Sequence, residues 1–131
     1  MNSHTEQNIA GLIANIYNGN IIKITSPSNV EISLDTGLKL FSFMQQMFRD
    51  IPFGVIIDKS NPYSLSPEMI VQGRPLTEST SLKIRAMAFL ANTPAGIEAS
   101  KMEINLLRDI VPTKICGNQS SAITWLNEQL K

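Results

Sequence analysis

The chain has 131 residues, of which 43% are hydrophobic and 17% are charged, and its eleven basic residues balance eleven acidic ones. This length fits one domain, and the zero net charge supplies no field that would attract nucleic acid or an anionic membrane. The single cysteine, Cys116, excludes an intrachain disulfide, and the single histidine, His4, disfavours a zinc site. A low charge density without net charge favours self-association.

The beginning of the sequence predicts no targeting or membrane segment. It lacks the basic, then apolar, then small-residue layout of a signal peptide, and no apolar run approaches the roughly 20 residues that span a bilayer. We therefore expect a cytoplasmic protein with no integral membrane segment. Residues 1–10 are predicted to be a flexible tail, and residues 11–131 are predicted to form a single domain.

Two strands joined by a tight turn are predicted to open the domain. Gly11 to Tyr17 and Ile21 to Thr25 are rich in strand-forming residues, and Asn18-Gly19-Asn20 between them tolerates the positive φ of a hairpin turn. Ser33 is then predicted to cap a helix that runs from Leu34 to Arg49.

This helix has an unusually wide apolar surface. Its apolar arc covers roughly 200°, whereas a helix that lies on a sheet needs roughly 100°. Leu40, Phe43 and Met47 form a second apolar ridge beyond that requirement. The ridge is a candidate interaction face for dimerisation, a protein partner or a lipid. The alternative is that a neighbouring helix or the amino-terminal segment covers it.

A short apolar run closed by an acid, Phe53 to Asp58, predicts a strand buried on both faces, as in a parallel sheet. The loop from Lys59 to Leu65 leads to Ser66, which is a predicted helix N-cap because proline follows it at the first helical position. This helix is predicted to be short and to end near Gln72, since Gly73-Arg74-Pro75 indicates a break.

Two further strand–helix units complete the predicted order. A strand from Ile84 to Ala91 precedes a helix from Pro94 to about Asp109, for which Thr93 before Pro94 is the predicted N-cap. A short strand from Pro112 to Cys116 precedes a last helix. Asn118 or Ser120 caps that helix, which ends near Lys131. The order β-β-α-β-α-β-α-β-α predicts an α/β fold with a mixed sheet of about five strands and about four helices.

Several segments between Tyr17 and the end of the chain together carry a family resemblance. They are Asn29 to Leu34, Gly54 to Asp58, Ser64 to Glu68, Ala86 to Leu90, Pro112 to Ile115 and Ala122 to Leu126. In this order and spacing they resemble the STAS-type fold of the anti-sigma-factor antagonists, and more specifically a small bacterial family of SpoIIAA-like proteins. The resemblance implies a SpoIIAA/STAS-like fold and a regulatory or binding module rather than an enzyme.

The resemblance also implies where a regulatory site would lie. Classical antagonists carry an Asp-Ser-Ser-Gly-type motif where the loop meets the second helix, and a partner kinase phosphorylates one serine there. This chain has Ser66-Pro67-Glu68 at that position, with proline near the acceptor position and no following glycine. Ser64 and Ser66 keep hydroxyl groups in the loop and are the candidate phospho-acceptors, and Asp58 is a candidate binding residue at the strand end.

Each of these residues also has a structural interpretation. Ser66 as an N-cap contributes about 1 kcal/mol to stability. Asp58 is of the type that accepts hydrogen bonds from the N–H groups of its own loop. Glu68 lies in a first helical turn, where compensation of the helix dipole explains an acid. Cys116 and Trp125 are interpreted as packing residues.

Three functions stay open at this point. The first is a non-enzymatic STAS-like regulatory module that binds another protein and forms a homodimer. The alternative is an α/β domain that binds an apolar, lipid-like ligand, which requires an enclosed cavity on the order of several hundred Å³. An enzyme is third, because the sequence shows no nucleophile–base pair, metal cluster or phosphate loop. We accordingly predict no catalytic residue, no cofactor, no metal and no nucleic-acid partner.

Overall fold

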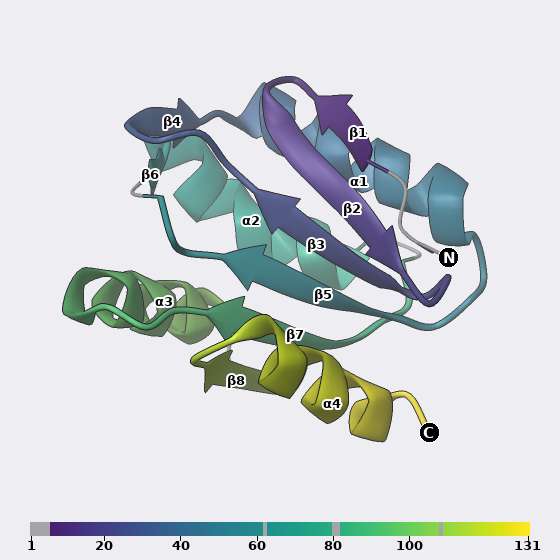
Figure 1. Ribbon diagram of the computed structural model, residues 1–131. Helices are drawn as coiled ribbons and strands as arrows, with labels where there is room; N and C mark the ends of the chain where they lie inside the picture. Colours follow the sequence, from purple (N-terminus) through teal and green to yellow (C-terminus); the bar gives the residue numbers. More distant parts are fainter. Residues whose placement is uncertain (1–5, 62, 80–81, 108) are drawn as a thin grey trace.

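The computed structural model describes residues 6–61, 63–79, 82–107 and 109–131 (Figure 1); His4 lies outside them. The strands are β1 (Glu6–Ile9), β2 (Leu12–Tyr17), β3 (Ile21–Thr25), β4 (Val30–Ile32), β5 (Phe53–Asp58), β6 (Tyr63–Leu65), β7 (Ile84–Leu90) and β8 (Thr113–Cys116). The helices are α1 (Leu34–Phe48), α2 (Pro67–Ser79), α3 (Pro94–Leu106) and α4 (Gln119–Gln129).

The main sheet has six strands in the order β1-β2-β3-β5-β7-β8. The first three pair antiparallel, and β3, β5, β7 and β8 pair in parallel. From β3 onward each crossover moves one strand along the sheet in the same direction. Right-handed crossovers of this kind place α1, α2 and α3 on one face, while α4 returns along the other face, over β5, β7 and β8 (Figure 1).

The sheet separates two apolar clusters. On the face of α1, Phe48 stacks on Phe53 with ring centroids 4.1 Å apart, and both side chains are fully buried. On the face of α4, Leu126 lies so close to β5 that a Cβ at Gly54 would come within 2.9 Å of a Leu126 methyl carbon. Glycine at this position therefore permits the close approach of α4 to the sheet.

The predicted turn and the predicted caps are present in the structure. Asn18 and Gly19 have φ of 55° and 76°, the left-handed conformation that the hairpin turn needs. Ser33 accepts a hydrogen bond from the N–H of Thr36, and Thr93 and Asn118 cap α3 and α4 in the same way. The last helix therefore starts after Asn118 rather than after Ser120.

The structure contains more strands than the sequence predicted. Residues 6–9, placed in a flexible tail, form β1 and pair with β2 because Ala10 and Gly11 adopt positive φ and reverse the chain. The predicted loop after β5 contains β6, which pairs with β4 in a separate two-stranded parallel sheet. β1 is largely polar and exposed and β6 has only three residues, so neither shows the apolar periodicity that identifies a strand.

The expected end of the second helix near Gln72 is wrong, because α2 continues through Pro75 to Ser79. Two side chains bond around the proline. Thr77 donates its hydroxyl to the carbonyl of Gly73, at 2.8 Å, and Arg74 donates to the Leu106 carbonyl of α3, at 3.4 Å. Contacts outside the helical ladder thus hold a segment whose local sequence indicates a break.

Candidate functional site

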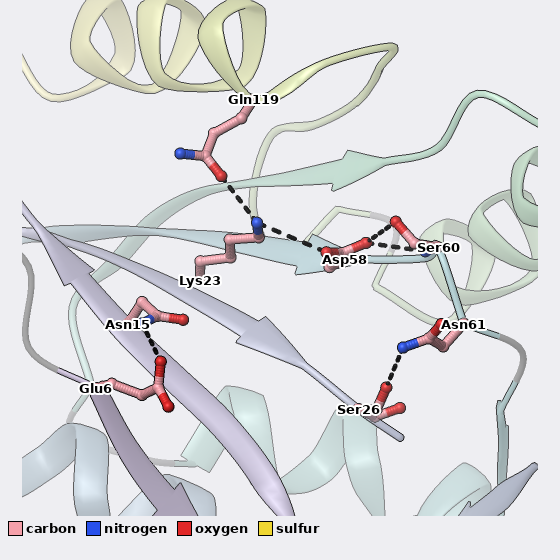
Figure 2. A network of polar contacts seen from close by, with 8 residues as sticks. All are labelled: Glu6, Asn15, Lys23, Ser26, Asp58, Ser60, Asn61 and Gln119. Carbon is pink, nitrogen blue, oxygen red and sulfur yellow. Dashed lines mark hydrogen bonds and ion pairs between the residues drawn. The ribbon is translucent and has the colours of Figure 1, made fainter. Parts of the chain in front are cut away.

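The carboxyl end of β5 carries a polar network that includes Asp58 (Figure 2). The Oδ1 of Asp58 accepts a hydrogen bond from the backbone N–H of Ser60, at 2.8 Å, and from the Ser60 hydroxyl. Its Oδ2 lies 3.6 Å from the Nζ of Lys23 on β3, which also donates to Gln119 of α4, at 2.8 Å. The Asp58 carboxylate is buried and bonded within the fold, as its structural interpretation expects.

A second contact fixes the loop that follows β5. The side-chain amide of Asn61 donates to the carbonyl of Ser26 at the end of β3, at 3.0 Å (Figure 2). Together with the Asp58 contacts, this bond joins the carboxyl ends of two neighbouring parallel strands. The loop after β5 is therefore held in place by hydrogen bonds to both strands and has a structural role.

The next residue, Lys59, belongs to a different cluster. Its ammonium group contacts the carboxylate of Glu103 on α3 and lies 2.6 Å from the hydroxyl oxygen of Tyr63. It also lies 4.0 Å from the centroid of the Tyr63 ring, in a cation–π contact. The Tyr63 hydroxyl donates to the same Glu103 oxygen, at 3.0 Å. Three side chains from the β5–β6 loop, β6 and α3 thus form one buried polar cluster, which we call the Lys59 cluster.

Burial perturbs both titratable donors of the Lys59 cluster. Lys59 is only 5% exposed, and burial lowers its pKa to about 7 because the charged amine loses its water. The contact with the Glu103 carboxylate acts in the opposite direction and favours the ammonium. Burial and then the negative charge of Asp58 raise the pKa of Tyr63 above its usual range, so Tyr63 keeps its hydroxyl proton.

The Lys59 cluster adjoins a cavity of about 140 Å³ between the sheet and the three helices on its face. Tyr63 and Glu103 belong to its lining. The sheet contributes aliphatic side chains, namely Leu12, Ile24, Val55, Ile57, Ile84 and Met87. The helices contribute mainly Leu40, Phe41, Met44, Met69, Gly73 and Leu106. The cavity is therefore apolar with a polar end.

The two candidate phospho-acceptors lie in different environments. The hydroxyl oxygen of Ser66 accepts the N–H of Met69, at 3.0 Å, and the residue is buried as the N-cap of α2. Ser64 is exposed in the middle of β6, opposite Glu31 of β4. The geometry at Ser66 therefore matches its interpretation as a cap, and Ser64 offers the accessible hydroxyl. Glu68 is exposed in the first turn of α2.

The predicted interaction ridge on α1 is only partly exposed. Leu40 and Phe43 are half-buried against the core on the α1 face of the sheet, and Leu40 also lines the cavity. Met47 is 41% exposed. Of the three residues, Met47 alone presents an exposed apolar side chain.

A second apolar surface lies between α1 and α2. It is an open groove of about 430 Å³ with Leu34, Leu38, Pro67, Val71 and Leu76 in its lining. Leu38 and Val71 are 44% and 66% exposed. We call this surface the α1–α2 groove.

The remaining residues singled out in the sequence have packing positions. Cys116 is buried, and burial raises the pKa of its thiol; Trp125 packs beside the α4 cluster. Within the described ranges, no three His, Cys, Asp or Glu side chains are grouped so as to hold a metal ion. Nor is any helix in that part of the chain long and apolar enough to cross a membrane.

Sequence reasoning missed the Lys59 cluster and the α1–α2 groove. Glu103 is 44 residues from Lys59 along the chain, and no motif links an exposed-looking loop lysine to a helical acid. The groove was missed because α2 was expected to end before Leu76. The one available signal was the adjacent apolar pair Ile70-Val71. Neighbouring residues of a helix point in different directions, so a single buried face needs only one of the two, and the other indicates a second apolar surface.

The comparisons with known proteins agree with this architecture. The structure is similar to the crystal structure of an uncharacterized protein of the DUF3478 family with a SpoIIAA-like fold from Shewanella loihica PV-4, with a TM-score of 0.62. The two sequences are 12% identical, and the match covers 96% of this chain and 97% of that one. At this identity the likeness shows the fold alone, and it confirms the predicted SpoIIAA/STAS-like fold. No curated protein matches the chain. A family model described as a domain of unknown function, DUF7793, matches residues 14–130, and the chain therefore belongs to the DUF7793 family.

Proposed function

We propose that the chain is a non-enzymatic, STAS-like regulatory module of the bacterial cytoplasm that acts by binding another protein. The observation that carries this proposal is the α1–α2 groove. Its lining is mainly apolar, with Leu34, Leu38, Val71 and Leu76, and Glu68 and Gln72 supply polar groups among them. An apolar centre with polar groups around it is the usual anatomy of a protein–protein interface.

The chemistry of the groove favours a protein over the other occupants of such a surface. The carboxylate of Glu68 lies in its lining and disfavours the phosphates of nucleic acids and lipid headgroups. A protein segment that presents apolar side chains avoids this repulsion and buries Leu38 and Val71.

A matched pair of variants tests this proposal. Val71→Glu places a charge in the groove, whereas Met102→Glu places one on α3 at a residue of similar exposure, 69%. A protein captured from the native host by wild-type chain is identified, purified and titrated against both variants. We expect Val71→Glu to weaken binding by at least about tenfold, because a desolvated charge costs more than 1.4 kcal/mol, and Met102→Glu to bind as wild type does.

Two results would contradict the proposal. One is a purified partner that binds the Val71→Glu variant with unchanged affinity, which would place the interface elsewhere. The other is a chain that forms a homodimer through this groove and binds no second protein, as measured by native mass spectrometry with and without Val71→Glu. The homodimer predicted from the low charge density would then be the whole function of the surface.

The regulatory part of the proposal rests on the β6 loop. We propose Ser64, rather than Ser66, as the phospho-acceptor, because Ser66 is buried and its hydroxyl oxygen is occupied as the N-cap of α2. Phosphopeptide mass spectrometry of the chain from its host, across growth conditions, measures both sites. Phosphate on Ser66, or phosphate on neither serine, would overturn this assignment.

A further inference from the structure

Two glycines lie in the lining of the cavity on the α1 face of the sheet, Gly37 of α1 and Gly73 of α2. A Cβ at Gly37 would clash with the Met69 sulfur, at 2.6 Å, so of the two only Gly73 leaves room for a side chain. Met69, Gly73 and Thr77 of α2 all face it, since residues four apart lie on one side of a helix. A Cβ at Gly73 would meet only the Met69 Cε, at 3.7 Å, which is ordinary van der Waals contact. The backbone therefore has room for a Cβ at Gly73, and glycine leaves that part of the cavity open.

The size of this space limits what it can hold. At about 140 Å³ it approaches the engineered apolar cavity of roughly 150 Å³ that binds benzene. It is smaller than the several hundred Å³ that a typical ligand pocket offers to a larger molecule such as a lipid. A single small ring matches this volume, whereas an extended acyl chain would have to project from the open side of the cavity.

The polar end of the cavity selects among small rings. The Lys59 ammonium and the Tyr63 hydroxyl both donate to one oxygen of Glu103, Oε2. The Glu103 side chain lines the cavity and is 18% exposed, and a carboxylate accepts more than two hydrogen bonds. We infer that this cavity binds a small, uncharged cyclic molecule that carries one hydroxyl or N–H donor, with the ring among the aliphatic side chains and the donor on Glu103.

Charge narrows the ligand class further. The cavity lining carries charges of both signs: the Glu103 carboxylate repels an anion, and the Arg74 guanidinium opposes a cation. The neighbouring Lys59 amine also opposes a cation whenever it is protonated. A neutral donor is compatible with both protonation states of Lys59. This inference goes beyond the proposed partner binding and does not depend on it, because the cavity and the α1–α2 groove have separate linings.

Methionine methyl groups supply a site-resolved test with phenol as the probe. Met44, Met69 and Met87 line the cavity, whereas Met47 and Met102 are exposed outside it. In ¹³C-methyl-methionine NMR spectra of the full chain, phenol should shift the first three signals in a saturable way and leave the other two unchanged. Benzene should bind about tenfold more weakly than phenol because it lacks the donor, and benzoate should not bind.

Two substitutions at Gly73 distinguish the effect on phenol affinity of filling the cavity from the effect of replacing glycine in a helix. Gly73→Leu should fill the space and weaken phenol binding by at least about tenfold. Gly73→Ala changes the same backbone position but adds only one methyl group, so it should keep the affinity for phenol within about threefold.

Each measurement has an outcome that would overturn the inference. Absence of saturable shifts with phenol at millimolar concentration, or equal shifts of Met47 and Met102, would exclude a binding site in this cavity. Unchanged phenol affinity in a folded Gly73→Leu variant would do the same. Benzene or benzoate that binds as tightly as phenol would refute the role of Glu103, and this comparison needs only the wild-type chain should Gly73→Leu fail to fold.

Discussion

Replacement of Glu103 by leucine would leave the buried amine of Lys59 without its carboxylate partner. Removal of one member of a buried ion pair destabilises a protein by about 3–5 kcal/mol. We expect the lower end, about 3 kcal/mol, because Lys59 keeps the Tyr63 hydroxyl at 2.6 Å and the Glu103 side chain is 18% exposed. With unfolding entropy of roughly 2 cal/mol/K per residue, this loss lowers Tm by about 10 °C.

The double variant distinguishes an ion pair from two independent packing contributions. Lys59→Met removes the amine and should destabilise by about 1–2 kcal/mol, because Glu103 then keeps the Tyr63 donor and partial access to water. The combination of Lys59→Met with Glu103→Leu leaves no buried charge, so its stability should lie within about 1.5 kcal/mol of wild type. Urea denaturation below pH 7, where the folded Lys59 carries its charge, followed by circular dichroism measures all four chains. Losses that add in the double variant, giving about 4–5 kcal/mol, would refute this reasoning.

Three further predictions concern single positions. Ser66→Ala should destabilise the chain by about 1 kcal/mol through loss of the α2 cap, whereas Ser64→Ala should leave the urea midpoint unchanged. Phe43→Glu should destabilise by about 3 kcal/mol because Phe43 packs against the core, and Met47→Glu by under about 0.5 kcal/mol; equal losses would contradict the observed difference in burial. Between about pH 7, where folded Lys59 titrates, and its unfolded pKa of 10.5, the unfolded chain holds a proton that the folded chain lacks. The free energy of unfolding should therefore rise with pH in wild type relative to Lys59→Met, and parallel profiles would mean that Glu103 keeps the amine protonated.

The strength of a local signal explains which parts of the fold could be predicted. Three helices are capped by the side chains of Ser33, Thr93 and Asn118. In each cap a side-chain oxygen accepts a hydrogen bond from an N–H only three residues later, so a short stretch of sequence is enough to predict it. The continuous apolar run of β5 identifies a strand buried on both faces by the same local logic. By contrast, β1 and β6 are strands only because β2 and β4 lie beside them.

The candidate sites depend more strongly on contacts between distant residues. The continuation of α2 past Pro75 is accompanied by a bond between Arg74 and Leu106, which are 32 residues apart, and it adds Leu76 to the lining of the α1–α2 groove. Asp58 and Ser66 were identified from the sequence, and the structure gives both of them local bonding partners. The cluster of Lys59, Tyr63 and Glu103 had no local signal.

The sequence by itself determined the alternation of strands and helices, the caps and the hairpin, because each follows from interactions between residues close together in the chain. The SpoIIAA/STAS-like fold followed from the resemblance of the segments, in their order and spacing, to a known family. Only the tertiary structure decided where chemistry or binding is concentrated. The packing of α1, α2 and α3 on one face creates the cavity and the groove, and it brings Glu103 to Lys59. Such features depend on which distant surfaces meet and on how completely their side chains fill the space between them, as the missing side chain of Gly73 illustrates.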